Sequence, residues 1–232
     1  MAKRKSEQDH IEAAKRAIIS AAVPHVMFDG WSEAALKAAI ADSGIAADLA
    51  NLAFPRGPLD LALGYHYQGD ADMRTAMEAL DLNTMRYSDR VAKAISLRLA
   101  LADKEAVRRG MAFFALPHNA GDGTRALWHT ADAIWESLGD TSRDYNWYTK
   151  RMTLSAVYSA CVLFWLGDKS EDGAETEAFI ARRIADVMRF EKTKANFRNS
   201  PFGKQFTAGF GKILNGIKAP EAPDDLPGKI HK

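Results

Sequence analysis

The sequence lacks several features that define large protein classes. It has one cysteine, Cys161, among 232 residues, which excludes an internal disulfide framework and a cysteine-built zinc site. Lys and Arg number 31 against 30 Asp and Glu, so the net charge of +1 favours neither nucleic acid nor a membrane as partner. The longest stretch without a charge, 152–167, has 16 residues, fewer than the roughly 20 that span a bilayer. We therefore interpret it as a buried helix.

Residues that favour strands are also scarce. Valine, isoleucine and threonine together number 29, whereas alanine alone numbers 40. Alanine is the best helix former and the other three favour strands. With an apolar fraction of 47%, the composition predicts an all-α globular protein with one sizeable core.

Sequence motifs for common chemistries are missing as well. The chain has no G-x-S-x-G elbow, P-loop, G-x-G-x-x-G or H-E-x-x-H motif. Its six histidines are scattered singly, and none has a glutamate three positions before it, so the Glu-x-x-His di-iron motif of helical bundles is absent. We expect no metal, no cofactor and no enzymatic activity.

The N-terminal third is divided into short helices. Apolar residues at helical spacing predict a helix over 8–23, ended by Pro24 and Asp29-Gly30. Ser32 caps a second helix that reaches about residue 41, and a third covers 46–53. This layout is typical of a small helix-turn-helix head.

Longer helices follow, and the composition changes again near the C-terminus. The predicted helices are 58–66, 70–80, 83–101, 103–115, 122–138, 144–167 and 173–190. The predicted divisions are a flexible N-terminus (1–9), a head (10–66), a larger helical domain (67–190), an amphipathic tail helix (191–218) and a disordered tail with three prolines (219–232).

The charge of the head argues against DNA binding. Residues 11–66 carry four basic and six acidic side chains, and the predicted recognition helix, 45–54, has Asp48 and no positive charge. Phosphate contacts need lysine and arginine, so the head is expected not to read DNA.

Five motifs, taken in order, carry a family resemblance. They are Pro24-His25-Val26 with Phe28-Asp29-Gly30-Trp31, then Phe54-Pro55-Arg56-Gly57-Pro58, Arg86-Tyr87-Ser88-Asp89-Arg90-Val91, the segment 139–151 (GDTSRDYNWYTKR), and Arg183-Ile184-Ala185-Asp186-Val187-Met188. Together they resemble the Coq-nine-type proteins of ubiquinone biosynthesis over roughly residues 10–215.

The resemblance implies a fold and a role. It implies a TetR-repressor-like all-helical fold whose head no longer reads DNA, a homodimer, and an apolar pocket for isoprenoid lipids that include quinone intermediates. It also implies an accessory protein without catalysis of its own, which presents its lipid to a membrane-associated di-iron hydroxylase. The alternative is a TetR-like, ligand-responsive transcriptional regulator.

The N-terminal segment suggests a location for such a protein. It is short, mixed in charge and unlike a mitochondrial transit peptide. We therefore expect a bacterial member, in the cytoplasm and peripheral on the inner membrane.

Large apolar side chains of the C-terminal half are the candidates for the lipid pocket, because Phe and Met suit an adaptable apolar cavity. The same residues at helical spacing also fit an ordinary core, and both alternatives stay open. The candidates are Met111, Phe114, Leu127, Trp128, Ile134, Trp135, Met152, Tyr158, Cys161, Phe164 and Trp165.

The start of the predicted helix 144–167 is a candidate partner surface. Asp144 can cap this helix, and Trp147, Tyr148 and Arg151 follow it at i+3, i+4 and i+7, on one face. Trp, Tyr and Arg are enriched in interface hot spots, and in the family this region contacts the hydroxylase. The alternative is a helix start packed on the core.

The predicted tail helix is amphipathic and basic. An apolar stripe bordered by lysines is typical of a helix that lies on an anionic membrane surface. Four glycines weaken it in water, and docking on its own domain or on a dimer mate is the alternative. The membrane candidates are Phe202, Lys204, Phe206, Phe210, Lys212, Ile213, Leu214 and Ile217.

Overall fold

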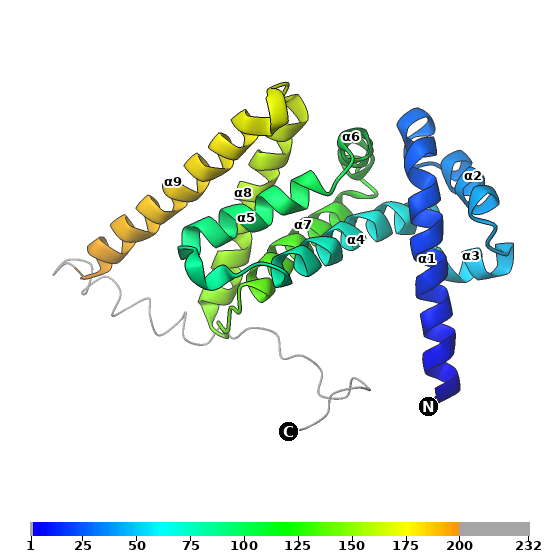
Figure 1. The fold of residues 1–232 in the computed structure, drawn as a ribbon, viewed down its shortest axis with the longest axis horizontal. Coiled ribbons are helices and arrows are strands. Elements are labelled where there is room, and N and C mark those ends of the chain that lie inside the picture. The colour runs from blue at the N-terminus through cyan, green and yellow to red at the C-terminus, as the bar shows by residue number, and fades with distance from the viewer. Residues whose placement is uncertain (1, 200–232) are drawn as a thin grey trace.

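The structure, a computed structural model, describes residues 2–199, and these residues form helices without any strand (Figure 1). The all-α prediction is confirmed. The α-helices are α1 (Ala2–Asp29), α2 (Glu33–Ser43), α3 (Ala47–Ala53), α4 (Pro58–Glu78), α5 (Tyr87–Ala100), α6 (Lys104–Phe114), α7 (Ala120–Ser137), α8 (Tyr145–Gly167) and α9 (Ala174–Asn199).

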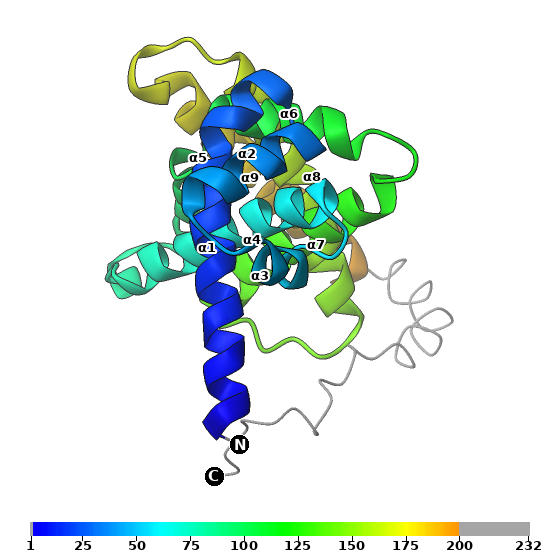
Figure 2. The same ribbon diagram turned by 90° about the vertical axis from the view of Figure 1, so that its right-hand side faces the viewer.

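The helices form a small head and a larger body, which lie at opposite ends of the view in Figure 1. Helices α1, α2 and α3 make the head, and in Figure 2 helices α2 and α3 lie in front of α1. Helices α5, α7, α8 and α9 make the body, and α4 runs from one part into the other.

Helix α1 continues past Pro24, so the predicted end at 23 is wrong. The helix runs to Asp29 with Pro24 inside it. Ala22 and Val26, on either side of the proline, are fully buried in the head core, and their burial offsets the hydrogen bond that a proline removes. The helix ends where Gly30 takes a φ of 65°, a conformation that suits glycine.

Helix α4 crosses the predicted division between head and body at residues 66 and 67. The two helices predicted over 58–66 and 70–80 are one continuous helix. Its first turns place Leu61 and Ala62 in the head core, and its later turns place Met73 and Met77 in the body core. Head and body therefore share a rigid element.

A glycine in the middle of α4, in the gap between the two predicted helices, marks close packing. A Cβ on Gly69 would lie 2.7 Å from Cζ of Arg98 on α5. The missing side chain lets the guanidinium group lie directly against the backbone of α4.

Helix α9 also continues further than predicted. The expected boundary at 191 lies inside α9, because no glycine or proline interrupts residues 174–199. The remainder of the predicted tail helix and the predicted disordered end, 200–232, lie outside the described residues.

A buried ion pair joins α4 to α5. Asp70 is fully buried and Arg98 is 3% exposed, and Arg98 Nε donates to Asp70 Oδ1 over 2.7 Å. From α7, the Thr130 hydroxyl donates to the same carboxylate at 2.9 Å and His129 Nδ1 donates at 2.7 Å. Burial alone would raise the pKa of Asp70, but these bonds and the charge of Arg98 hold that pKa below its usual value. The carboxylate is therefore ionised at neutral pH.

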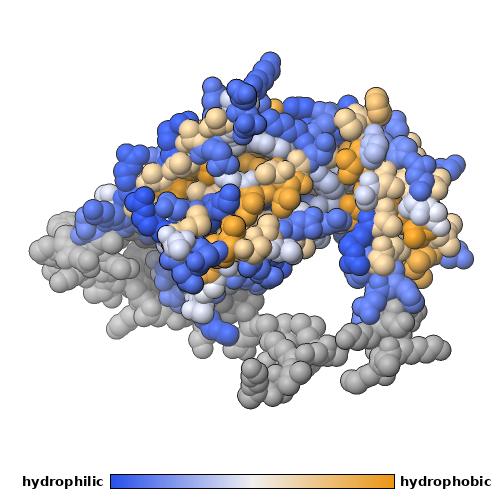
Figure 3. Space-filling view, viewed as in Figure 1, coloured by the Kyte–Doolittle hydropathy of each residue, from blue (hydrophilic) through white to orange (hydrophobic). Residues whose placement is uncertain are grey.

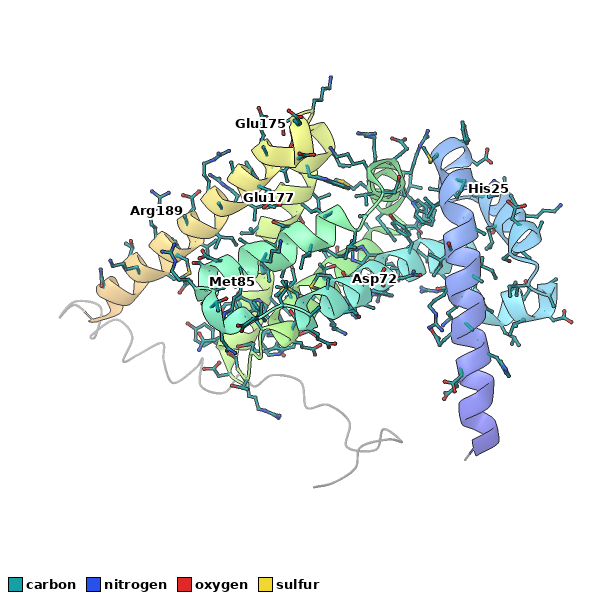
Figure 4. The ribbon with its side chains drawn as sticks, in the orientation of Figure 1. His25, Asp72, Met85, Glu175, Glu177 and Arg189 are labelled. Carbon is teal, nitrogen blue, oxygen red and sulfur yellow. The ribbon has the colours of Figure 1, made fainter. Side chains whose placement is uncertain are left out.

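We expect the substitution Asp70→Asn to lower the free energy of unfolding by about 3–5 kcal/mol, because it leaves the Arg98 charge buried without its counter-charge. Urea denaturation measures this loss. The matched control is Asp72→Asn, since Asp72 lies two residues further along α4, is exposed, and is labelled in Figure 4. Equal stability of the two variants would show that the ion pair contributes little.

Candidate functional site: a cavity between head and body

A cavity of about 360 Å³ lies where the head meets the body. Trp31 and Ala62 line it from the head side, and helices α5, α6, α7 and α8 supply the other walls. Trp31 also donates from Nε1 to the carbonyl of Ala106 on α6 over 3.1 Å, which fixes the head against that wall. Most of the lining is apolar, and a volume of this size suits a small organic ligand.

The cavity has an open end and a closed end. Met111 on α6 and Leu163 on α8 line the cavity and are 38% and 59% exposed. Ala62, Arg98 and Tyr158 line it from positions that are at least 96% buried. We call the first end the mouth and the second end the floor.

His66 on α4 also lines the cavity, beside Arg98, and connects it to the buried ion pair. Its Nε2 atom lies 3.0 Å from the carbonyl of Ala126 and 2.7 Å from the Thr130 hydroxyl. A carbonyl oxygen only accepts, so Nε2 carries the hydrogen and Nδ1 of the neutral ring is an acceptor. Burial lowers the pKa of His66 to about 4, which keeps the ring neutral at pH 7.

The structure brings some of the predicted lipid residues together at this cavity. Met111, Phe114, Leu127 and Tyr158 line it. Trp135 instead lines a separate cavity of about 200 Å³ between α5, α7, α8 and α9.

The other predicted lipid residues lie elsewhere, because each helix also packs against neighbours other than the cavity. Ile134, Cys161 and Trp165 belong to the body core, and burial raises the pKa of the Cys161 thiol to about 11. Phe164 stacks on Phe179 with ring centroids 4.3 Å apart. Met152 is 63% exposed, and Trp128 contacts the aromatic residues described next.

Sequence reasoning missed the polar floor and the head's share of the cavity. In the sequence, Trp31 entered only as part of a family motif, His66 was one of six scattered histidines, and Arg98 was given no role. The available signal was the spacing of His66 and Asp70, which lie one helical turn apart.

The segment predicted to bind a partner forms an aromatic cluster. Trp128 of α7 lies 5.7 Å from Trp147 and 6.3 Å from Tyr148, measured between ring centroids. Asp144 caps α8 by accepting from the backbone N–H of Asn146 at 3.0 Å. We call Trp128, Trp147 and Tyr148 the aromatic patch.

Arg151 supports this patch from below, so its predicted place on the surface is corrected. It is 2% exposed, forms ion pairs with Asp132 and Asp140, and its guanidinium lies 4.1 Å from the centre of the Trp147 ring. Two carboxylates hold the charged group inside, and the stacking fixes the orientation of the indole.

No described helix is long and apolar enough to cross a membrane. Among residues 2–199, no group of three or more His, Cys, Asp or Glu side chains is arranged to hold a metal ion. The predicted membrane residues, 202–217, lie outside the described residues.

Comparison with known proteins now bears on this cavity and this patch. Residues 120–191, which include the aromatic patch and much of the cavity wall, match the COQ9 family model. The chain is therefore similar to COQ9 proteins over this region. It is 27% identical over 198 residues to human "Ubiquinone biosynthesis protein COQ9, mitochondrial", an alignment covering 82% of this chain and 62% of that protein. The Drosophila melanogaster protein of the same name is 26% identical, with 88% and 65% covered.

The fold assignment agrees with a solved structure. A TetR transcriptional regulator from Nitrosomonas europaea superposes with a TM-score of 0.59 at 19% identity, covering 74% of this chain and 95% of that one. The predicted TetR-like fold is thereby confirmed, and at this identity the likeness concerns the fold alone.

The expected location is corrected by the same comparisons. The relatives from human, cattle, Dictyostelium discoideum and Drosophila melanogaster are all named as mitochondrial proteins. They point to a mitochondrial location, and the expectation of a bacterial protein in the cytoplasm at the inner membrane is wrong. The chain spans about three fifths of the length of the human and bovine relatives.

We expect acid to destabilise the fold through His66. The pKa of His66 is about 4 in the folded protein and 6.5 ordinarily. Between pH 6.5 and pH 4, His66 is therefore protonated in the unfolded chain but neutral in the folded chain. Stability is therefore complete above pH 6.5 and lost as the pH falls, by about 2 kcal/mol at pH 5. Thermal unfolding of the wild type and of His66→Gln at both pH values measures it. The variant should lose less on acidification, and an equal loss would remove His66 from this account.

Proposed function

We propose that this COQ9-like protein is a non-catalytic accessory protein of ubiquinone biosynthesis. It binds an isoprenoid quinone intermediate in the cavity between head and body and presents it to a membrane-associated hydroxylase. The observation that carries the proposal is an apolar, partly open cavity in a chain whose relatives are named for ubiquinone biosynthesis. A polyprenyl tail is too apolar to cross water unaided, so a carrier must supply apolar surface.

The aromatic patch supports the second half of this role. Two tryptophans and a tyrosine lie together, and a buried arginine holds one indole in place. Rigid aromatic groups of this kind contribute much of the binding energy in protein interfaces. We assign the hydroxylase to this surface.

Contact with an anionic membrane and a homodimer complete the proposal. On the face that Figure 3 shows, hydrophobic side chains gather in patches over the body and along the head, bordered by hydrophilic ones. On α8 and α9, Met152, Leu163, Met188 and Phe190 are each about half exposed or more, which supports association with a second copy. Membrane attachment rests on the basic, apolar pattern of residues 202–217.

We expect Val162→Trp to reduce the lipid that copurifies with the protein. Val162 lines the cavity and is 6% exposed, so the larger indole would occupy space that the ligand needs. A steric penalty of about 1–3 kcal/mol corresponds to roughly a fivefold to 150-fold loss of affinity. Mass spectrometry of extracted lipids measures the occupancy. Val187→Trp, the same change in the smaller cavity, is the control. Wild-type protein that carries no polyprenyl lipid or quinone would contradict the proposal.

We expect Trp147→Lys to weaken binding of the hydroxylase by roughly 30-fold, the loss typical of an interface hot spot. The cavity is unchanged, so the lipid content should stay the same. Pull-down of the hydroxylase and lipid analysis of the same samples separate the two effects. The control is Phe28→Lys, because Phe28 is an aromatic residue of the head that is 83% exposed. Undiminished capture of the enzyme by the Trp147 variant would remove the patch from the interface.

A further inference from the structure

The floor of the cavity holds two hydrogen-bond donors that the protein itself leaves unused. Arg98 Nε donates a hydrogen bond to Asp70 Oδ1 at 2.7 Å, and Arg98 Nη2 donates one to the backbone carbonyl of His66 at 3.0 Å. Its Nη1 has no hydrogen-bond partner among residues 2–199, and neither has the hydroxyl of Tyr158. Both side chains line the cavity and are at least 96% buried. Buried donors normally find a partner, so two unused donors on residues that line the same cavity point to a ligand.

Tyr158 remains a donor at neutral pH. Burial raises the pKa of its phenol, and the nearby charge of Arg98 opposes this rise only in part. The hydroxyl therefore keeps its hydrogen. Its side chain belongs to α8 and that of Arg98 to α5, so the two donors reach the floor from different walls.

An acceptor stands beside these donors. The neutral ring of His66 uses its Nε2 hydrogen on Ala126 and Thr130, which leaves Nδ1 as an acceptor. His66 also lines the cavity. The floor thus offers two donors and one acceptor at the end of an apolar chamber.

The charge of the floor is already balanced. The positive charge of Arg98 is paired directly with the carboxylate of Asp70, which other side chains also bind. A carboxylate or phosphate ligand would meet a cation that is already neutralised, and it would lose its hydration on entering the cavity. A neutral ligand with oxygen atoms avoids that cost.

We propose that Arg98, Tyr158 and His66 are specificity residues that bind a neutral, oxygen-bearing ring, a quinone or quinol, at the floor of the cavity. The donors hold a ring oxygen, the acceptor takes the hydrogen of a ring hydroxyl, and the apolar tail extends past Met111 and Leu163 at the mouth. This inference rests on the proposed function and adds the head group, its orientation and the residues that select it.

The orientation has a consequence for delivery. A head group held at the closed end is shielded from water and from other enzymes while it is bound. Transfer to a hydroxylase then requires release of the ligand from the floor, and reaction inside the cavity is not part of the cycle.

Two probes with the same tail test the inference on the full-length protein: a decyl-substituted benzoquinone and decanoic acid, titrated by calorimetry at neutral pH. We expect the wild type to bind the quinone more tightly than the acid. Tyr158→Phe removes only an unpartnered hydroxyl, so the fold should be unaffected and quinone affinity should fall about tenfold. Tyr87→Phe, at the smaller cavity, is the matched control and should leave the affinity unchanged.

A second variant tests the charge balance. Asp70→Asn leaves Arg98 without its counter-charge, so decanoic acid should bind this variant more tightly than it binds the wild type, while the quinone gains nothing. Decanoic acid should also raise the melting temperature of the variant. A merely structural role for Asp70 predicts weaker binding of both probes.

The outcomes separate this inference from the proposed function. If both probes bind the wild type equally, or if Tyr158→Phe binds the quinone as tightly as the wild type, the head-group assignment is overturned and the lipid carrier stands. If neither probe binds, or if Val162→Trp binds the quinone unchanged, the cavity is not the lipid site and both proposals fail.

Discussion

The ion pair between Asp70 and Arg98 is the interaction on which the rest of the structure depends. It ties α4 to α5 inside the protein, and its carboxylate also receives bonds from two side chains of α7. Because α4 contributes to both hydrophobic cores, the same pair fixes the head relative to the body. A buried pair costs desolvation and contributes little net stability, so its value here is in specifying one arrangement of three helices around the cavity.

Helix α7 connects the cavity to the proposed partner surface. Ala126 and Leu127 line the cavity, Trp128 joins the aromatic patch, and Thr130 bonds to Asp70. Asp132, half a turn on, holds Arg151 beneath Trp147. Since an α-helix turns about 100° per residue, positions two apart, such as Ala126 and Trp128, serve nearly opposite faces, and the ligand site and the patch lie back to back on one rigid element. A hydroxylase docked on the patch would stand one helix away from the ligand.

The sequence predicted most of the helices because apolar spacing and capping residues are local signals. Ser32 caps α2 through its bond to the N–H of Ala35, as expected. The errors arose where local signals conflict with packing. Pro24 was read as a helix end, although burial of Ala22 and Val26 carries α1 past it. Gly69 lies in the gap between two predicted helices, although it admits Arg98. Arg151 was placed on the surface, although Asp132 and Asp140 compensate its burial.

By itself the sequence determined the helical class, the family resemblance and four of the residues that line the cavity, Met111, Phe114, Leu127 and Tyr158. These follow from composition, from motifs and from spacing along single helices. Only the tertiary structure decided that the head shares the cavity and that its floor is polar. Arg98 lies 28 positions and Thr130 lies 60 positions from Asp70 in the sequence. No periodicity connects residues on different helices. Their meeting depends on how α4, α5 and α7 pack, which is set by the fit of whole helix faces.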